Sequence, residues 1–152
     1  MTSIFQKLNL KDQTELLIVN APESFETEIA ALNKITIRRT HKEIKAITFA
    51  LAFVTKQKEV DTLTKAIAKK ATGDAIVWFA YPKGTSKNYT CEFNRDTGWA
   101  LLGEFDFEPV RQVAIDEDWS ALRFRRVEFI KTLTRTKSMA LTKQGKKRTT
   151  GK

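Results

Sequence analysis

The chain has 152 residues, of which 27 are Lys or Arg and 18 are Asp or Glu, giving a formal net charge of +9. This length predicts one domain with a core of its own, and the single Cys excludes an internal disulfide. No stretch approaches the roughly 20 apolar residues that cross a membrane, and the N-terminus lacks a signal-peptide pattern. We therefore expect a soluble, cytoplasmic protein with no membrane partner.

The positive charge is concentrated at the C-terminus. Eight Lys and Arg residues and no acidic residue follow Ile130, whereas residues 1 to 130 hold 19 basic and 18 acidic residues. The terminal segment is rich in Thr, Lys and Gly, so it offers too little apolar surface to offset the entropy of ordering it. The sequence predicts a nearly neutral domain over 1–127 and a basic, disordered tail over 128–152.

Apolar runs and amphipathic stripes alternate along the first half of the chain. A buried strand is expected over 15–20, and Pro22 then suits the first turn of a helix that runs to about Leu32. The short β-branched segment 35–38 and the long apolar run 46–54 predict the second and third strands.

The second half of the chain continues this alternation and ends in two strands. Thr55 can cap a helix that Gly73 ends. The remaining expected elements are a strand over 75–81, a helix over 94–103, and strands over 110–115 and 119–127. Because so short a link joins the last two strands, we expect them to be antiparallel neighbours.

Buried strands alternating with amphipathic helices predict an α/β fold. We expect a single three-layer Rossmann-like domain, with a mostly parallel sheet that ends in an antiparallel hairpin. One link resists this prediction, because about six residues from Thr40 to Lys45 join the second and third strands, fewer than the dozen usual for a parallel crossover. The alternatives are a stretched loop, shifted boundaries, or a hairpin between these two strands.

Five segments carry a resemblance to known proteins: Asn20–Glu23, Phe49–Val54, Trp78–Lys83, Val113–Asp116 and Trp119–Arg125. They resemble a family of small bacterial proteins catalogued only as a domain of unknown function, over about residues 5 to 127. The layout also looks like a shortened S-adenosylmethionine-dependent methyltransferase fold, in which parallel strands precede a terminal antiparallel hairpin. The resemblance implies an order of parts and a compartment, and it brings no known activity.

The residues themselves test whether such a fold could hold a nucleotide cofactor. A dinucleotide or S-adenosylmethionine site needs glycines in the first strand-to-helix turn and an acidic residue after the second strand. This chain has Asn20-Ala21-Pro22 in the first place and Arg38-Arg39 in the second, and no Gly precedes Gly73. We therefore expect no cofactor. The two arginines mark either a solvated strand end, which we favour, or an anion contact.

The loop from Lys83 to Lys87 is the best local candidate for binding chemistry. It leaves the carboxyl end of a central strand, where open α/β sheets bind ligands, and its ammonium and hydroxyl groups suit a phosphate or carboxylate. A plain polar turn is the alternative. The candidate ligand-binding residues around a residual cleft are Asn20, Tyr81, Lys83, Ser86, Lys87, Asp116, Trp119, Ser120 and Arg123.

Groups for catalysis or metal binding are harder to find. The carboxylates of Asp116–Asp118 could bind a metal or transfer protons, but an acidic hairpin turn explains them better. The one His and one Cys leave a four-ligand zinc site to be completed by carboxylates. We assign no catalytic residue and no metal site.

Three functional classes follow from these observations. We favour a non-catalytic binding or regulatory domain that recognises a small anionic ligand or a protein partner. The first alternative is a nucleic-acid-associated protein whose tail residues Lys143, Lys146, Lys147 and Arg148 contact phosphates. The weaker alternative is an enzyme acting on a small anionic substrate held by Lys83 and Arg123.

Overall fold

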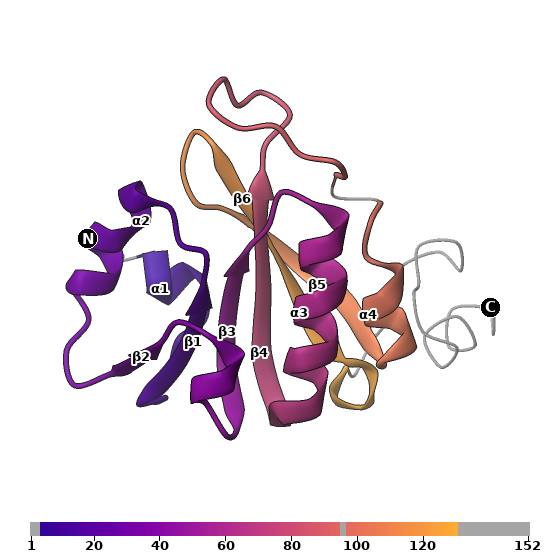
Figure 1. Cartoon of the computed structure of the whole chain (residues 1–152). Coiled ribbons are helices and arrows are strands. Elements are labelled where there is room, and N and C mark those ends of the chain that lie inside the picture. The colour runs from indigo at the N-terminus through magenta and orange to yellow at the C-terminus, as the bar shows by residue number, and fades with distance from the viewer. Residues whose placement is uncertain (1–3, 95–96, 131–152) are drawn as a thin grey trace.

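One six-stranded sheet organises the molecule, and the computed structural model describes residues 4–94 and 97–130 (Figure 1). The strand order is β2-β1-β3-β4-β6-β5. Strands β1 to β4 are parallel, while β6 is antiparallel to both β4 and β5. The strands are β1 (Glu15–Val19), β2 (Thr36–Arg38), β3 (Ile47–Phe53), β4 (Ala71–Pro82), β5 (Phe107–Ala114) and β6 (Trp119–Arg126). The predicted α/β class with a terminal antiparallel hairpin is confirmed.

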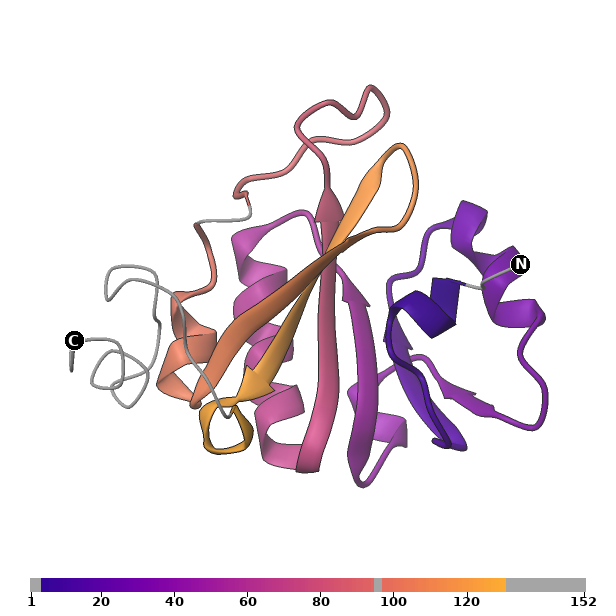
Figure 2. The ribbon, with the colours of Figure 1, turned by 180° about the vertical axis from the view of Figure 1, so that it is seen from behind.

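Helices cover both faces of this sheet, which gives the three expected layers (Figures 1 and 2). The helices are α1 (Ile4–Lys7), α2 (Glu23–Ala30), α3 (Gln57–Lys70) and α4 (Ala100–Glu104), with short 3-10 turns η1 (His41–Glu43) and η2 (Val127–Phe129). Helices α1 and α2 pack on one face, and α3 and α4 pack on the other. Successive residues of a strand point to opposite faces, so the central strands contribute to both layers of core.

The aliphatic and aromatic runs noted in the sequence form these two layers of core. On the α3 side, Val77 and Phe79 of β4 pack with Val60 and Leu63 of α3. On the α1 and α2 side, Trp78 is fully buried, and its indole Nε1 donates to the carbonyl of Leu8 at 2.8 Å. This bond ties the segment after α1 to the middle of the sheet.

The short link between β2 and β3 is a parallel connection. Both strands pair in parallel with β1, one on each side, and Leu17 of β1 pairs with Arg38 of β2 and with Ala50 of β3. A parallel connection must run back from the end of one strand to the start of the next. Because β2 has only three residues, this return path is short enough for the link. Lys70 of α3 holds the link by donating to the carbonyls of His41 and Ile44. The alternative of a hairpin between β2 and β3 is wrong.

Several element boundaries differ from those expected. Strand β4 begins directly after α3, so Gly73 lies inside the strand with φ of +56° instead of ending the helix. The pairing with β3 is irregular there, because Ile47 pairs with Ala71 but Phe49 pairs with Ile76. Helix α1, which the sequence did not predict, has only four residues and is therefore too short to show a helical period.

The start of α3 depends on a residue inside the helix. Glu59 lies in its first turn, and its carboxylate accepts from the backbone N–H groups of Thr55 at 2.9 Å and Lys56 at 3.1 Å. These bonds satisfy donors that precede the helix, as in a capping box. The helix consequently begins at Gln57, and the Glu59 side chain takes the capping role expected of Thr55.

The described part of the chain ends just after β6. Residues 127–129 form η2, and Val127 and Ile130 are both buried. The segment 131–152, with Lys143, Lys146, Lys147 and Arg148, lies outside the described residues, so a disordered tail that binds nucleic acid stays a prediction. No helix in the described ranges is long and apolar enough to cross a membrane.

Candidate anion-binding pocket

The carboxyl ends of β1, β3 and β4 meet at one edge of the sheet. After β1 the chain runs to β2 on one side, and β3 returns on the other side of β1, so the topology switches between β1 and β3. Open α/β sheets bind ligands at such points. Because β6 is antiparallel, the turn that enters it lies at the same edge, beside the loop that follows β4 (Figure 1).

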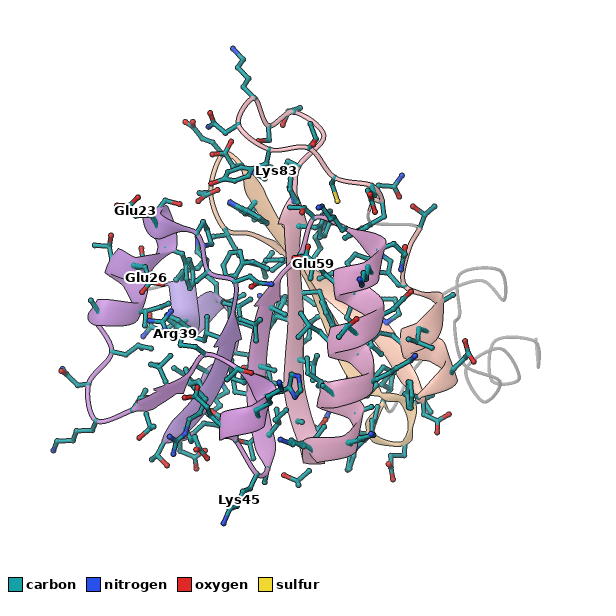
Figure 3. The ribbon with its side chains drawn as sticks, viewed as in Figure 1. Glu23, Glu26, Arg39, Lys45, Glu59 and Lys83 are labelled. Carbon is teal, nitrogen blue, oxygen red and sulfur yellow. The ribbon has the colours of Figure 1, made fainter. Side chains whose placement is uncertain are left out.

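A pocket of about 810 Å³ lies under the loop that follows β4. Four of the nine candidate residues line it, namely Tyr81, Lys83, Ser86 and Ser120. Tyr81 and Ser120 come together because they are register partners on β4 and β6, and partners in an antiparallel pair share a face. Lys83 lies at the base of the loop (Figure 3).

Gln112 of β5 supplies the third polar group of the pocket. Its Nε2 donates to the Tyr81 hydroxyl at 3.0 Å and to the Ser120 hydroxyl at 2.9 Å. These two bonds fix the orientation of the Gln112 amide and link strands β5, β4 and β6. Sequence reasoning missed Gln112, because it is far from Tyr81 along the chain and no local motif links the two residues. Only the register of β5 on β6 could have identified it.

The charge of the lining favours an anion. Among the described residues that line the pocket, Lys83 is the only charged one. Aromatic walls come from Tyr89 and Phe93. Cys91 also lines the pocket, and burial raises the pKa of its thiol, so near neutral pH it is a neutral thiol and adds no negative charge.

The loop above the pocket is held by Asp118 of the β5–β6 turn. The Ser86 hydroxyl donates to Asp118 Oδ1 at 2.9 Å, and the Asn88 amide donates to Asp118 Oδ2 at 3.2 Å. The backbone N–H of Lys83 donates to the Asp118 carbonyl at 2.8 Å. Ser86 thus uses its hydroxyl to position the loop, while Lys87 is exposed and lies outside the lining.

The other acidic candidate, Asp116, is engaged in its own turn. Its Oδ1 accepts from the backbone N–H of Asp118 at 2.8 Å and of Trp119 at 2.9 Å. Side-chain bonds of this kind are typical of tight Asx turns. Over residues 4–94 and 97–130, no group of three or more His, Cys, Asp or Glu side chains is placed to hold a metal ion.

Four aromatic side chains run along the same edge, three of them on the opposite face of the sheet and the fourth, Tyr89, in the loop that also lines the pocket. We call Phe25, Phe53, Trp119 and Tyr89 the aromatic row. Its ring centroids are 5.1 Å apart from Phe25 to Phe53, 5.1 Å from Phe53 to Trp119, and 4.8 Å from Trp119 to Tyr89. Phe53 and Trp119 are buried. The row therefore fills the region behind the carboxyl ends of β3 and β4.

The turn after β1 is built without the features of a nucleotide site. Asn20 has φ of +59°, and its Nδ2 donates to the carbonyl of Phe53 at 3.4 Å. Pro22, which lacks an N–H, precedes α2, whose first turn carries Glu23 and Glu26. Carboxylates at a helix N-terminus repel a phosphate.

The arginine that ends β2 and the one that follows it both have carboxylate partners within the chain. Arg38 Nε lies 2.6 Å from Glu15 Oε2. Arg39 forms a bidentate pair with Glu26, with its Nη1 and Nη2 at 2.7 and 2.9 Å from the two carboxylate oxygens (Figure 3). The end of β2 therefore presents guanidinium groups at the position where a nucleotide site has a carboxylate that binds the ribose hydroxyls. The residues present do not fit a dinucleotide or S-adenosylmethionine.

The Arg39–Glu26 pair should make the stability of the fold decrease as the pH falls into the acid range. Its hydrogen bonds lower the pKa of Glu26, so the pair stabilises the fold above the unfolded pKa of Glu, and this contribution is lost as the pH falls through the lower folded value. The loss in urea midpoint between pH 7 and pH 3 should be smaller in Glu26→Gln than in the wild type. Glu28→Gln, on the same helix, is the control, and equal losses in both variants would contradict the assignment.

Five candidate residues do not line the pocket. Lys87 lies in the loop above the pocket and Asp116 in the β5–β6 turn. Asn20 belongs to the turn after β1, and Trp119 belongs to the aromatic row. Arg123 is the register partner of Trp78, so it lies on the face opposite to Tyr81. Successive side chains of a strand alternate between its two faces, and Arg123 comes three positions after Ser120 in β6. The two side chains therefore point to opposite faces.

Sequence comparisons add no family assignment. No family model matches the chain, and no curated protein matches it by sequence. The resemblance to a bacterial family of unknown function therefore finds no support, whereas the methyltransferase-like layout does.

That support comes from solved structures. The N-methyltransferase NodS from Bradyrhizobium japonicum WM9 has a TM-score of 0.51 at 13% identity, over 81% of this chain and 92% of its own. A SAM-dependent methyltransferase from Aquifex aeolicus has a TM-score of 0.53 at 11% identity, over 82% of this chain and 88% of its own. The chain has a methyltransferase-like Rossmann fold. Identities this low establish the fold alone.

Proposed function

We propose that this protein is a non-catalytic binding domain that uses a methyltransferase-like fold to hold a small anionic ligand beneath residues 83–94. One observation carries the proposal. Lys83 is the single charged residue among the described lining of a pocket that is otherwise neutral, polar and aromatic. An ammonium group in partly desolvated surroundings favours a negatively charged group.

The absence of catalysis is inferred from the turns that would hold a cofactor. The turn Asn20-Ala21-Pro22 has no glycine, and the carboxylates of Glu15 and Glu26 are paired with Arg38 and Arg39. A methyltransferase-like protein without a place for its methyl donor has no group to transfer. The fold then serves as a scaffold for the neighbouring pocket.

The lining also indicates the shape of the ligand. A volume of about 810 Å³ lies within the range of pockets that bind small organic molecules. Lys83 would pair with a carboxylate or phosphate, Gln112 and Ser120 would hydrogen-bond a neutral polar group, and Tyr89 and Phe93 would pack against a flat apolar body. We infer a ligand that combines one anionic group with a ring.

Thermal shift measurements test this proposal on the full chain. The probes are benzoate, adenosine monophosphate and S-adenosylmethionine at matched ionic strength. We expect at least one of the two anions to raise the melting temperature in a saturable manner, since a ligand at 100 times its Kd stabilises by about 2.7 kcal/mol. S-adenosylmethionine should give no shift.

Two lysines of the same loop make a matched pair of variants. Lys83→Ala should abolish the ligand-induced shift, whereas Lys87→Ala should preserve it, because Lys87 is exposed and does not line the pocket. A shift that survives in Lys83→Ala refutes the assigned pocket. Saturable binding of S-adenosylmethionine refutes the non-catalytic assignment.

A further inference from the structure

Three arginines gather on the face of the sheet that α1 and α2 share. Arg111 of β5 and Arg123 of β6 are register partners, and Arg125 lies two residues further along β6. Partners across an antiparallel pair and alternate residues of one strand point to the same face. Like charges directly opposite each other in a sheet are destabilising, so this arrangement costs the fold stability.

This part of the sheet lacks a helical layer on that face. Helices α1 and α2 lie over β1, β2 and β3, and no helix of the described chain covers β5 and β6 from the same side (Figure 2). Arg111 is exposed, and Arg123 is half-buried between the two neighbouring strands. Arg111 is therefore accessible from solvent, and Arg123 is accessible in part.

The carboxylate of Asp74 is already paired with Arg125. Asp74 accepts from Arg125 Nε at 2.8 Å and from Arg125 Nη2 at 2.5 Å. No ion pair in the described ranges involves Arg111 or Arg123. The cluster thus holds two guanidinium groups that form no ion pair with a described carboxylate.

Arg123 also carries an unsatisfied donor. Its Nε is buried and finds no hydrogen-bond acceptor in the described part of the chain. Burial lowers the pKa of Arg123, the positive charges of Arg125 and Arg111 lower it further, and the carboxylate of Asp74 opposes this shift. A buried donor without an acceptor costs about 1–3 kcal/mol, and such local costs are expected at functional or strained sites.

We propose that Arg111 and Arg123 bind the phosphate group of a phosphorylated ligand on the face of the β5–β6 hairpin. Guanidinium groups present planar, fixed donors that match phosphate oxygens. A phosphate monoester carries about −1.5 to −2 charges near pH 7, which balances the two unpaired guanidinium groups. This site is independent of the pocket under residues 83–94, because the two lie on opposite faces of the sheet.

The test titrates the full chain with inorganic phosphate by calorimetry, with chloride adjusting the ionic strength. Arg111→Gln and Arg123→Met should each weaken phosphate binding by about 10- to 100-fold, as expected for loss of a hydrogen bond to a charged group. Arg38→Gln is the control, because Arg38 is paired with Glu15 at the other edge of the sheet, and it should bind phosphate as the wild type does. Lys83→Ala should also retain phosphate binding, which separates this site from the pocket.

Three outcomes would overturn the proposal. They are the absence of saturable binding to the wild type, unchanged affinity in Arg111→Gln, and equal binding of acetate at the same ionic strength, which would indicate screening without recognition. Arg111 is exposed, so its variant remains informative even if Arg123→Met does not fold.

Discussion

Replacing Phe53 by Ala should lower the free energy of unfolding by about 3–5 kcal/mol. Phe53 ends β3, is 2% exposed, and packs between Phe25 and Trp119 with both ring centroids at 5.1 Å. Removing the ring leaves a cavity in the middle of the aromatic row, because Phe25 and Trp119 are carried by different elements and cannot both move into the space. The loss combines the transfer of apolar surface with the cavity itself.

Urea denaturation of Phe53→Ala and Phe53→Leu measures this effect. Leu retains most of the volume, so Phe53→Leu should cost less than about 1.5 kcal/mol. Because Tyr89 contacts Trp119 at 4.8 Å, Phe53→Ala should also weaken anion binding beneath residues 83–94. A loss below about 1 kcal/mol in Phe53→Ala would show that the row does not fill this edge of the sheet.

Gly98→Ala should be the second severe substitution. Gly98 has φ of +94°, and a Cβ added there would lie 2.7 Å from the Cβ of Phe93 and 2.9 Å from Gln57 Oε1. The backbone strain costs about 1–3 kcal/mol, and the forced displacement of Phe93 adds about 1–3 kcal/mol. Phe93 is buried against Trp99 and lines the pocket, so ligand binding should weaken together with stability.

Gly84→Ala provides the matched control in the neighbouring loop. A Cβ at Gly84 would meet no atom within 4 Å, so its effect on the melting temperature should correspond to no more than about 0.5 kcal/mol. Thermal denaturation of the two variants in parallel gives the comparison. Equal stability of Gly98→Ala and Gly84→Ala would contradict the close packing of Phe93 on the glycine.

Most strands could be predicted because their signals are local. The run Leu16–Val19 and the run Phe49–Phe53 are continuous and apolar, and both are buried parallel strands. The β5–β6 hairpin followed from the short link between its strands. Helix α1 could not be predicted, because its stability depends on contacts of Phe5 and Leu8 with the sheet rather than on helical periodicity.

The candidate site was less accessible to sequence reasoning. Of the residues proposed from their position near strand ends, Tyr81, Lys83 and Ser120 line one pocket, and their role in binding stays a prediction. Gln112 escaped attention, and Arg123 belongs to the other face. Both differences have one cause, since a shift of one residue in strand register exchanges the faces of every side chain. Register depends on pairing between distant segments, which composition and periodicity do not report.

The sequence by itself determined the α/β layout, the absence of glycine before Gly73, and the concentration of positive charge after Ile130. Each of these depends on residues that are neighbours in the chain. The tertiary structure alone decided that aromatic side chains fill the edge behind β3 and β4, and that Arg38 and Arg39 pair with Glu15 and Glu26. It also placed Arg111 opposite Arg123, because such contacts arise only once strands and helices distant in sequence have packed against one another.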